Sequence, residues 1–131
     1  MAVHVFVYDD SVDVTINGLD RWLSLSAGVH LPMDDVLGAR VASFEEVRSD
    51  IGWRVGGTYW PRSWGGGIAT GWYTVPGRKG ARQLWCVFTD PEVLVIDTTL
   101  ERPSRVVLQV PDRHDLAWFI GERLARRRAA T

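Results

Sequence analysis

The segment whose residue types most suggest a binding function is 58–75, TYWPRSWGGGIATGWYTV. In it, three consecutive glycines lie close to an arginine and three tryptophans. A glycine-rich loop that binds a dinucleotide leads directly into a helix, because the helix N-terminus binds the pyrophosphate. Here Gly71 is followed by WYTV, which is typical of a strand, and no Gly-Lys-Ser/Thr of a phosphate loop follows. The sequence therefore favours a structural role, in which the glycines supply bulges and bends at the corner of a sheet.

The same corner carries a group of residues suited to recognition. Trp60, Arg62 and Trp64 alternate aromatic and cationic side chains, and such residues often anchor protein interfaces. We predict that they contact a protein partner, which is either another protein or a second copy of the chain.

A second candidate site lies in the sequence VPGRKGARQ, where Arg78, Lys79 and Arg82 follow the turn signal Pro76-Gly77. A basic loop at the tip of a β-hairpin can contact lipid phosphates, and each charge contributes about 1 kcal/mol near an anionic surface. These residues therefore form a candidate anionic-ligand site, and a solvated hairpin is the alternative.

The remaining reactive side chains lack the spacing of a catalytic or metal site. Cys86 alternates with Leu84 and Phe88, which predicts a small buried hydrophobe rather than a nucleophile. The histidines are scattered without ligand spacing: His4, His30 and His114. The sequence predicts no enzyme activity, no metal and no cofactor.

Composition fits a single domain. The chain has 131 residues, of which 46% are hydrophobic and 24% charged, enough to bury one shared core. A single cysteine excludes an intramolecular disulfide and is typical of a reducing compartment. The N-terminus lacks the basic and apolar regions of a signal peptide, so we expect a cytoplasmic protein, with peripheral association at the inner face of the membrane as the alternative.

Charge is unevenly distributed along the chain. Residues 1–50 carry a net charge of −6 and residues 51–131 a net charge of +5, which sum to −1. A domain with one acidic and one basic face favours self-association or a charged partner. The near-neutral total lacks the footprint of a nucleic-acid-binding protein, so no nucleic-acid partner is expected.

Periodicity predicts about seven strands and one C-terminal helix. Apolar residues alternate on both sides of a turn at residues 9–11, which predicts two strands or one bent strand over residues 3–16. Asn17-Gly18 then predicts a tight turn into a return strand that ends at Pro32. Ser43 begins a short helical turn at capping-box spacing from Glu46. The further strands are 36–42, 53–55, 68–75, 84–88, 93–98 and 105–110.

The last element is an amphipathic helix beginning near Asp112 and ending near residue 128, in which Leu116, Phe119, Ile120 and Leu124 recur at helical spacing. We predict that Phe119 and Ile120 pack on the sheet. Four tryptophans fall within strand or helix patterns and are predicted to fill the core: Trp53, Trp72, Trp85 and Trp118.

This order of elements resembles the small bacterial pleckstrin-homology-like (PH-like) domains, particularly those of actinobacteria. The matching pieces are LPMDDVLGARV, RVGGTYWP followed by GGGIATG, LWCVF leading to DPEVLVI, and VVLQVPDRHDLAWFI. The resemblance covers nearly the whole chain. It implies one PH-like domain over residues 1–131, with antiparallel strands in a partly open barrel or sandwich capped by the helix.

The resemblance also implies a non-enzymatic interaction module, which binds another protein or its own copies through an exposed sheet edge or the tryptophan-rich corner. Eukaryotic PH domains that bind phosphoinositides carry basic residues around their first hairpin loop. The corresponding loop here, INGLDRW, has one arginine and one acid, so inheritance of that activity is not predicted.

Overall fold

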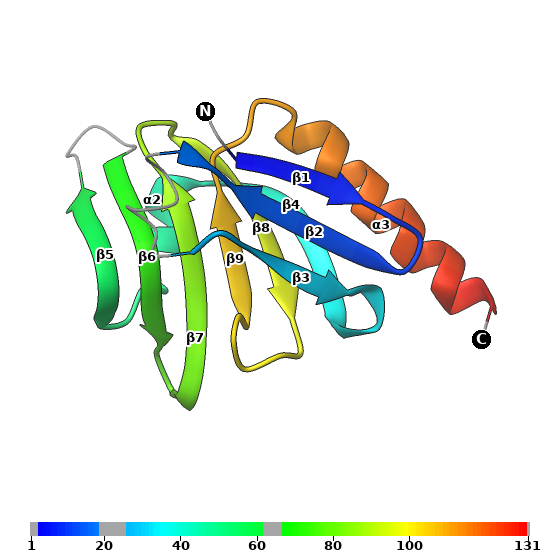
Figure 1. Cartoon of the computed structure of the whole chain (residues 1–131), viewed down its shortest axis with the longest axis horizontal. Helices are drawn as coiled ribbons and strands as arrows, with labels where there is room; N and C mark the ends of the chain where they lie inside the picture. The colour runs from blue at the N-terminus through cyan, green and yellow to red at the C-terminus, as the bar shows by residue number, and fades with distance from the viewer. Residues whose placement is uncertain (1–2, 19–25, 62–66, 131) are drawn as a thin grey trace.

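The computed structural model describes residues 3–18, 26–61 and 67–130. Within them the chain is mainly β with one long C-terminal helix, as predicted (Figure 1). The elements are β1 (Val3–Val7), β2 (Ser11–Ile16), β3 (Gly28–Pro32), η1 (Met33–Asp35), β4 (Val36–Ser43), α2 (Phe44–Arg48), β5 (Arg54–Pro61), β6 (Gly67–Val75), β7 (Arg78–Val87), β8 (Glu92–Thr98), β9 (Arg105–Leu108) and α3 (Arg113–Ala130).

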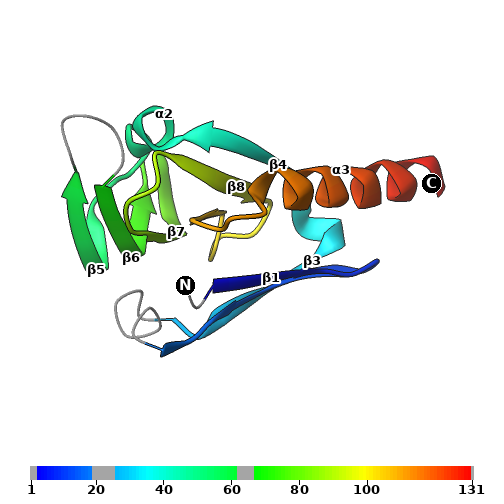
Figure 2. The ribbon, with the colours of Figure 1, turned by 90° about the horizontal axis from the view of Figure 1, so that it is seen from above.

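The described strands form two sheets that do not close into a barrel, whereas the sequence left open a partly open barrel or a sandwich. A three-stranded antiparallel sheet has the order β1-β2-β3, and a six-stranded sheet has the order β4-β8-β9-β7-β6-β5. The predicted count of about seven strands is too low, since the described residues form nine. The chain changes sheets at η1, where Met33 is buried and its N–H donates to the carbonyl of Asp10. The sheets pack face to face without closing (Figure 2).

The six-stranded sheet departs at β9 from the antiparallel arrangement that the resemblance implies. This strand lies between β7 and β8, antiparallel to β8 but parallel to β7. A parallel partner distant in sequence cannot be read from local alternation, because periodicity reports which face a residue occupies and not which strand lies beside it.

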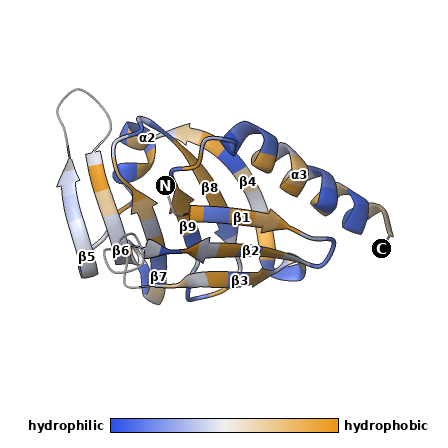
Figure 3. Ribbon diagram, turned by 45° about the horizontal axis from the view of Figure 1, so that its top comes forward, coloured by the Kyte–Doolittle hydropathy of each residue, from blue (hydrophilic) through white to orange (hydrophobic). Residues whose placement is uncertain are grey.

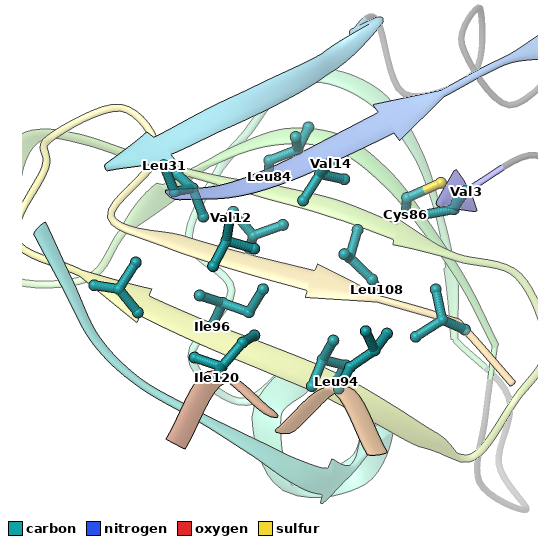
Figure 4. Close-up of a cluster of buried hydrophobic side chains, with 14 of the residues drawn as sticks. Val3, Val12, Val14, Leu31, Leu84, Cys86, Leu94, Ile96, Leu108 and Ile120 are labelled. Atoms are coloured by element: carbon teal, nitrogen blue, oxygen red, sulfur yellow. The ribbon is translucent and has the colours of Figure 1, made fainter. Parts of the chain in front are cut away.

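Two apolar cores cover the two faces of the larger sheet. The first lies between the sheets and α3, where Val12 and Val14 point toward Leu84, Ile96 and Leu108 (Figure 4). The second lies under α2, where Phe44 meets Trp85 edge-on with ring centroids 6.0 Å apart. Hydrophobic and hydrophilic residues are mixed along β1–β3 and α3 (Figure 3), as expected for elements with one covered face.

Helices α2 and α3 begin where the sequence predicts. Ser43 accepts a hydrogen bond from the Glu46 N–H at 3.1 Å, which confirms the predicted cap of α2. Helix α3 begins at Arg113, directly after Asp112. It buries a stripe at i, i+4 and i+8, namely Leu116, Ile120 and Leu124.

Three aromatic residues predicted to pack inside are exposed. Trp118 and Phe119 are 61% and 44% exposed because the buried stripe of α3 leaves them on its outer side, where their rings contact each other. Trp53 is 84% exposed because it lies between α2 and β5, at the end of the sheet. Trp85 is fully buried, as predicted, and Trp72 is partly buried.

Part of the charge asymmetry is neutralised within the molecule. Arg123 of α3 lies 3.0 Å from the Asp9 carboxylate, and Arg127 pairs with Asp34. The basic C-terminal helix is thereby held against acidic turns of the N-terminal half, which reduces the charge available for self-association.

Gly57 and Gly71 form a directly opposed pair in the β5–β6 ladder. Their φ angles are +116° and +104°, and a Cβ on Gly71 would lie 2.0 Å from the carbonyl oxygen of Gly56. Residues that carry a side chain rarely adopt these φ angles, and their Cβ atoms would clash here with the backbone of the opposite strand. At these two positions the glycine motif therefore has the structural role that the sequence favours, whereas Gly65 and Gly66 lie outside the described residues.

We predict that Gly71→Ala lowers the free energy of unfolding by roughly 2 kcal/mol or more, because it combines backbone strain with a steric clash. Gly38→Ala is the matched control, since nothing lies within 4 Å of a Cβ there, and its effect should stay within about 0.5 kcal/mol. Urea unfolding measures both. Equal midpoints for the two variants would show that β5 and β6 do not need this close approach.

Tyr73 links the second core to the β5–β6 ladder. Its hydroxyl donates to the carbonyl oxygens of Thr58 at 2.8 Å and Thr70 at 2.9 Å. Burial raises the pKa of the Tyr73 hydroxyl from 10.0 to about 12. Because the pKa is higher in the folded state, the folded protein retains this proton more strongly than the unfolded chain between those two values.

We therefore predict that the free energy of unfolding falls as pH rises from 10.0 to about 12, and that Tyr73→Phe removes most of this fall. The variant should also lose about 1 kcal/mol at neutral pH with its hydrogen bonds. Tyr8→Phe, at a half-exposed position, is the control. Denaturant unfolding at stepped pH checks this, and an unchanged alkaline slope in Tyr73→Phe would assign the slope to another group.

Candidate functional site: the β5 edge and the basic rim

Strand β5 has eight residues, is an edge of the six-stranded sheet and pairs with β6 at every residue except Val55. Helix α3 packs against the opposite edge strand, β4, and against β1. Strand β3 is also an edge, but it has five residues and ends in Pro32. Among the described strands, β5 is thus the longest edge without a neighbouring element, and Figure 2 shows it beyond the area covered by the smaller sheet.

Exposed apolar side chains accompany this edge. Val55 is 57% exposed and Trp60 is 68% exposed. Trp60 is opposite Ile68 in the ladder, whereas its neighbour Tyr59 packs against the second core. Of the predicted interaction trio, Trp60 is placed on the surface as expected, and Arg62 and Trp64 lie outside the described residues.

Arg78, Lys79 and Arg82 lie at one end of the same sheet. Pro76 and Gly77 form the tight turn between β6 and β7, with Gly77 at φ +79°. The pairing then shifts from Val75↔Arg78 to Thr74↔Arg82, so the ladder is irregular where the basic residues lie. The predicted loop is therefore a short turn followed by an irregular start of β7, and it keeps Arg78 and Lys79 exposed.

Residues from other connections join them. Trp53, Arg78, Lys79 and Arg82 line one open depression of about 540 Å³. The Arg102 guanidinium, in the β8–β9 connection, donates through Nε to the carbonyl of Gly80 at 3.2 Å. We call this end of the sheet the basic rim, comprising Leu37, Trp53, Arg54, Arg78, Lys79, Arg82 and Arg102.

Sequence reasoning missed Leu37, Trp53, Arg54 and Arg102 as members of this rim. Leu37 is the second residue of β4 and Arg102 precedes β9, so their proximity depends on strand order. Of the four residues, only Trp53 had a local signal in the sequence, since it follows Gly52 and precedes a strand.

Two of the acidic groups that border the rim, Asp50 and Asp97, already have cationic partners. Asp97 accepts from Arg105 Nε at 2.6 Å and from Arg40 at 2.8 Å, and Arg105 also bonds Asp50 at 2.9 Å. Arg78 borders this cluster, in a depression of about 320 Å³. No hydrogen bond or ion pair joins its side chain to another described residue, so its charge remains available.

The reactive side chains noted in the sequence occupy structural or surface positions. Cys86 is fully buried in the first core, as predicted (Figure 4). His114 and Arg113 hydrogen-bond the Glu92 carboxylate, and Arg113 contributes most to the lowered pKa of that group. His30 pairs with Asp13 on the surface at 2.6 Å. Within the described ranges, no group of three or more His, Cys, Asp or Glu side chains is arranged to hold a metal ion.

No family model, no curated protein and no solved structure matches this chain. The helices in the described part of the chain are too short or too polar to cross a membrane.

Proposed function

We propose that this protein is a non-enzymatic, PH-like binding module that takes an extended segment of another polypeptide onto the edge of β5. The observation that carries the proposal is the eight-residue edge strand that no other described element covers, with Val55 and Trp60 exposed beside it. The PH-like relationship is supported by two packed sheets followed by a C-terminal helix. Nine strands and the insertion of β9 depart from the pattern that the resemblance implies.

The physical basis is strand addition. An edge strand presents backbone N–H and C=O groups that a second chain can pair with, and side-chain contacts then give specificity. An exposed tryptophan provides a large apolar contact at small entropic cost, which is why tryptophans dominate many interfaces. The partner strand comes from another protein or from a second copy of the chain, because the backbone edge serves both.

Features at the two ends of β5 limit the length that can pair. The ladder shifts register between Arg54 and Gly56, and Pro61 lacks an N–H to donate. Bulges and prolines on edge strands oppose uncontrolled sheet extension. Between them, Gly56–Trp60 forms a short segment suited to one bound strand rather than to open-ended assembly.

We predict that Trp60→Ala weakens binding of an extended peptide at least tenfold, because interface tryptophans commonly contribute about 2 kcal/mol or more. Peptides selected from a random display library provide the ligand, and sedimentation of the free protein tests self-association. Val55→Lys should act similarly by placing a charge beside the edge. Phe6→Ala, at a half-exposed position on β1, is the control and should bind normally.

Hydrogen exchange locates the contact. Bound peptide, or self-association, should protect backbone amides of Gly56–Trp60 in the parent protein. The proposal is contradicted if selected peptides protect another surface, if the Trp60 and Phe6 variants behave alike, or if neither peptide binding nor self-association occurs.

A further inference from the structure

The basic residues of this protein divide into paired and unpaired sets. Outside α3, three described arginines pair with carboxylates: Arg40, Arg48 and Arg105. The other described arginine and lysine side chains outside α3 lack a carboxylate partner among the described residues, and all five belong to the basic rim: Arg54, Arg78, Lys79, Arg82 and Arg102. The fold therefore concentrates unneutralised positive charge at one end of the six-stranded sheet.

Exposed apolar side chains lie at the same end. Trp53 is 84% exposed and Leu37 is 56% exposed. Arg78 connects them, since it lines both the depression of about 540 Å³ that contains Trp53 and the depression of about 400 Å³ that contains Leu37. Tryptophan beside lysine and arginine is the combination found where proteins meet the headgroup region of a bilayer.

The distribution of these cations fits an extended anionic surface rather than one small anion. They come from the start of β5, the first residues of β7 and the β8–β9 connection. A lipid surface offers many phosphates side by side, which matches cations that are spread over several segments of the chain. Glu101 lies in the same connection as Arg102 and its carbonyl accepts from the Arg82 N–H, so one acidic residue reduces the positive charge of the rim without cancelling it.

We infer that the basic rim docks the protein on membranes that contain anionic lipids. The cations contact lipid headgroups, and the Trp53 indole lies in the interfacial region. The attraction is electrostatic and short-ranged, since salt screens it within about 8 Å at physiological ionic strength. This inference goes beyond the proposed function and is independent of it, because Trp60 and the middle of β5 are not part of the rim.

Co-sedimentation of the full chain with vesicles tests the inference. Phosphatidylcholine vesicles with about one quarter phosphatidylserine should bind the protein, and pure phosphatidylcholine should not. Lys79→Ala should lower the partition coefficient about fivefold, and the Arg78→Ala/Lys79→Ala double variant about 25-fold. Trp53→Ala, which changes no charge, should also lower binding. Trp60→Ala should bind vesicles normally. The vesicle assay therefore tests the basic rim separately from the β5 proposal, which the peptide assay tests.

Arg126→Ala is the matched control for Lys79→Ala. It removes the same charge from an exposed position on α3, and it should change the partition coefficient less than twofold. Equal losses for these two variants would mean that binding follows net charge and not the rim, which would overturn the inference. Absence of vesicle binding would also overturn it. So would saturable binding of inorganic phosphate that requires Arg78 and Lys79 without vesicle binding, because the rim would then hold a free anion.

Discussion

The pairing of β9 on both sides is the constraint on which the rest of the structure depends. Arg105–Leu108 joins β7 in parallel and β8 in antiparallel orientation, and its apolar residues serve both cores: Val106 and Leu108 face the first and Val107 faces the second. A strand that is buried on both faces buries apolar side chains in two cores, whereas a strand with one solvated face does so in one. Without β9 the larger sheet would divide into a β4–β8 pair and a β5–β7 unit.

The same pairing assembles the candidate sites. Leu37 and Arg102 belong to the β4–β8 side of the sheet, whereas Trp53 and Arg78 belong to the β5–β7 side. The basic rim exists because β9 holds the two sides together. On the far side of β7, β6 and β5 extend past the smaller sheet (Figure 2), so the architecture that forms the rim also leaves the β5 edge uncovered by any other described strand or helix.

Features set by neighbouring residues could be predicted from the sequence. The Ser43 cap, the Pro76-Gly77 turn, the burial of Cys86 and the Leu116–Leu124 stripe all depend on local geometry or on alternation within one element. The exposure of Trp53 and Trp118 could not be predicted, because a tryptophan within a regular pattern is buried only if another element covers it. Tertiary arrangement decides that, and hydrophobicity alone does not.

The composition of the basic rim was beyond prediction for a related reason. Arg78 and Arg105 are equally basic in the sequence, yet Arg105 has two carboxylates within hydrogen-bond distance and Arg78 has none among the described residues. Which cations stay unneutralised depends on partners such as Asp50 and Asp97, which the fold brings from distant segments. The sequence indicated that charge is unevenly distributed, and the strand order determines where positive charge stays unneutralised.

Native-state hydrogen exchange across increasing denaturant tests the role of β9 most directly. If both sides of the sheet depend on its pairing, the amides of Val106 and Val107 should exchange only through global unfolding, with the same free energy as the denaturant transition. The amides of β5 should exchange through smaller openings at the edge. Exchange of the β9 amides at a clearly lower free energy than those of β6 and β7 would contradict this account, because the rest of the sheet would then persist without it.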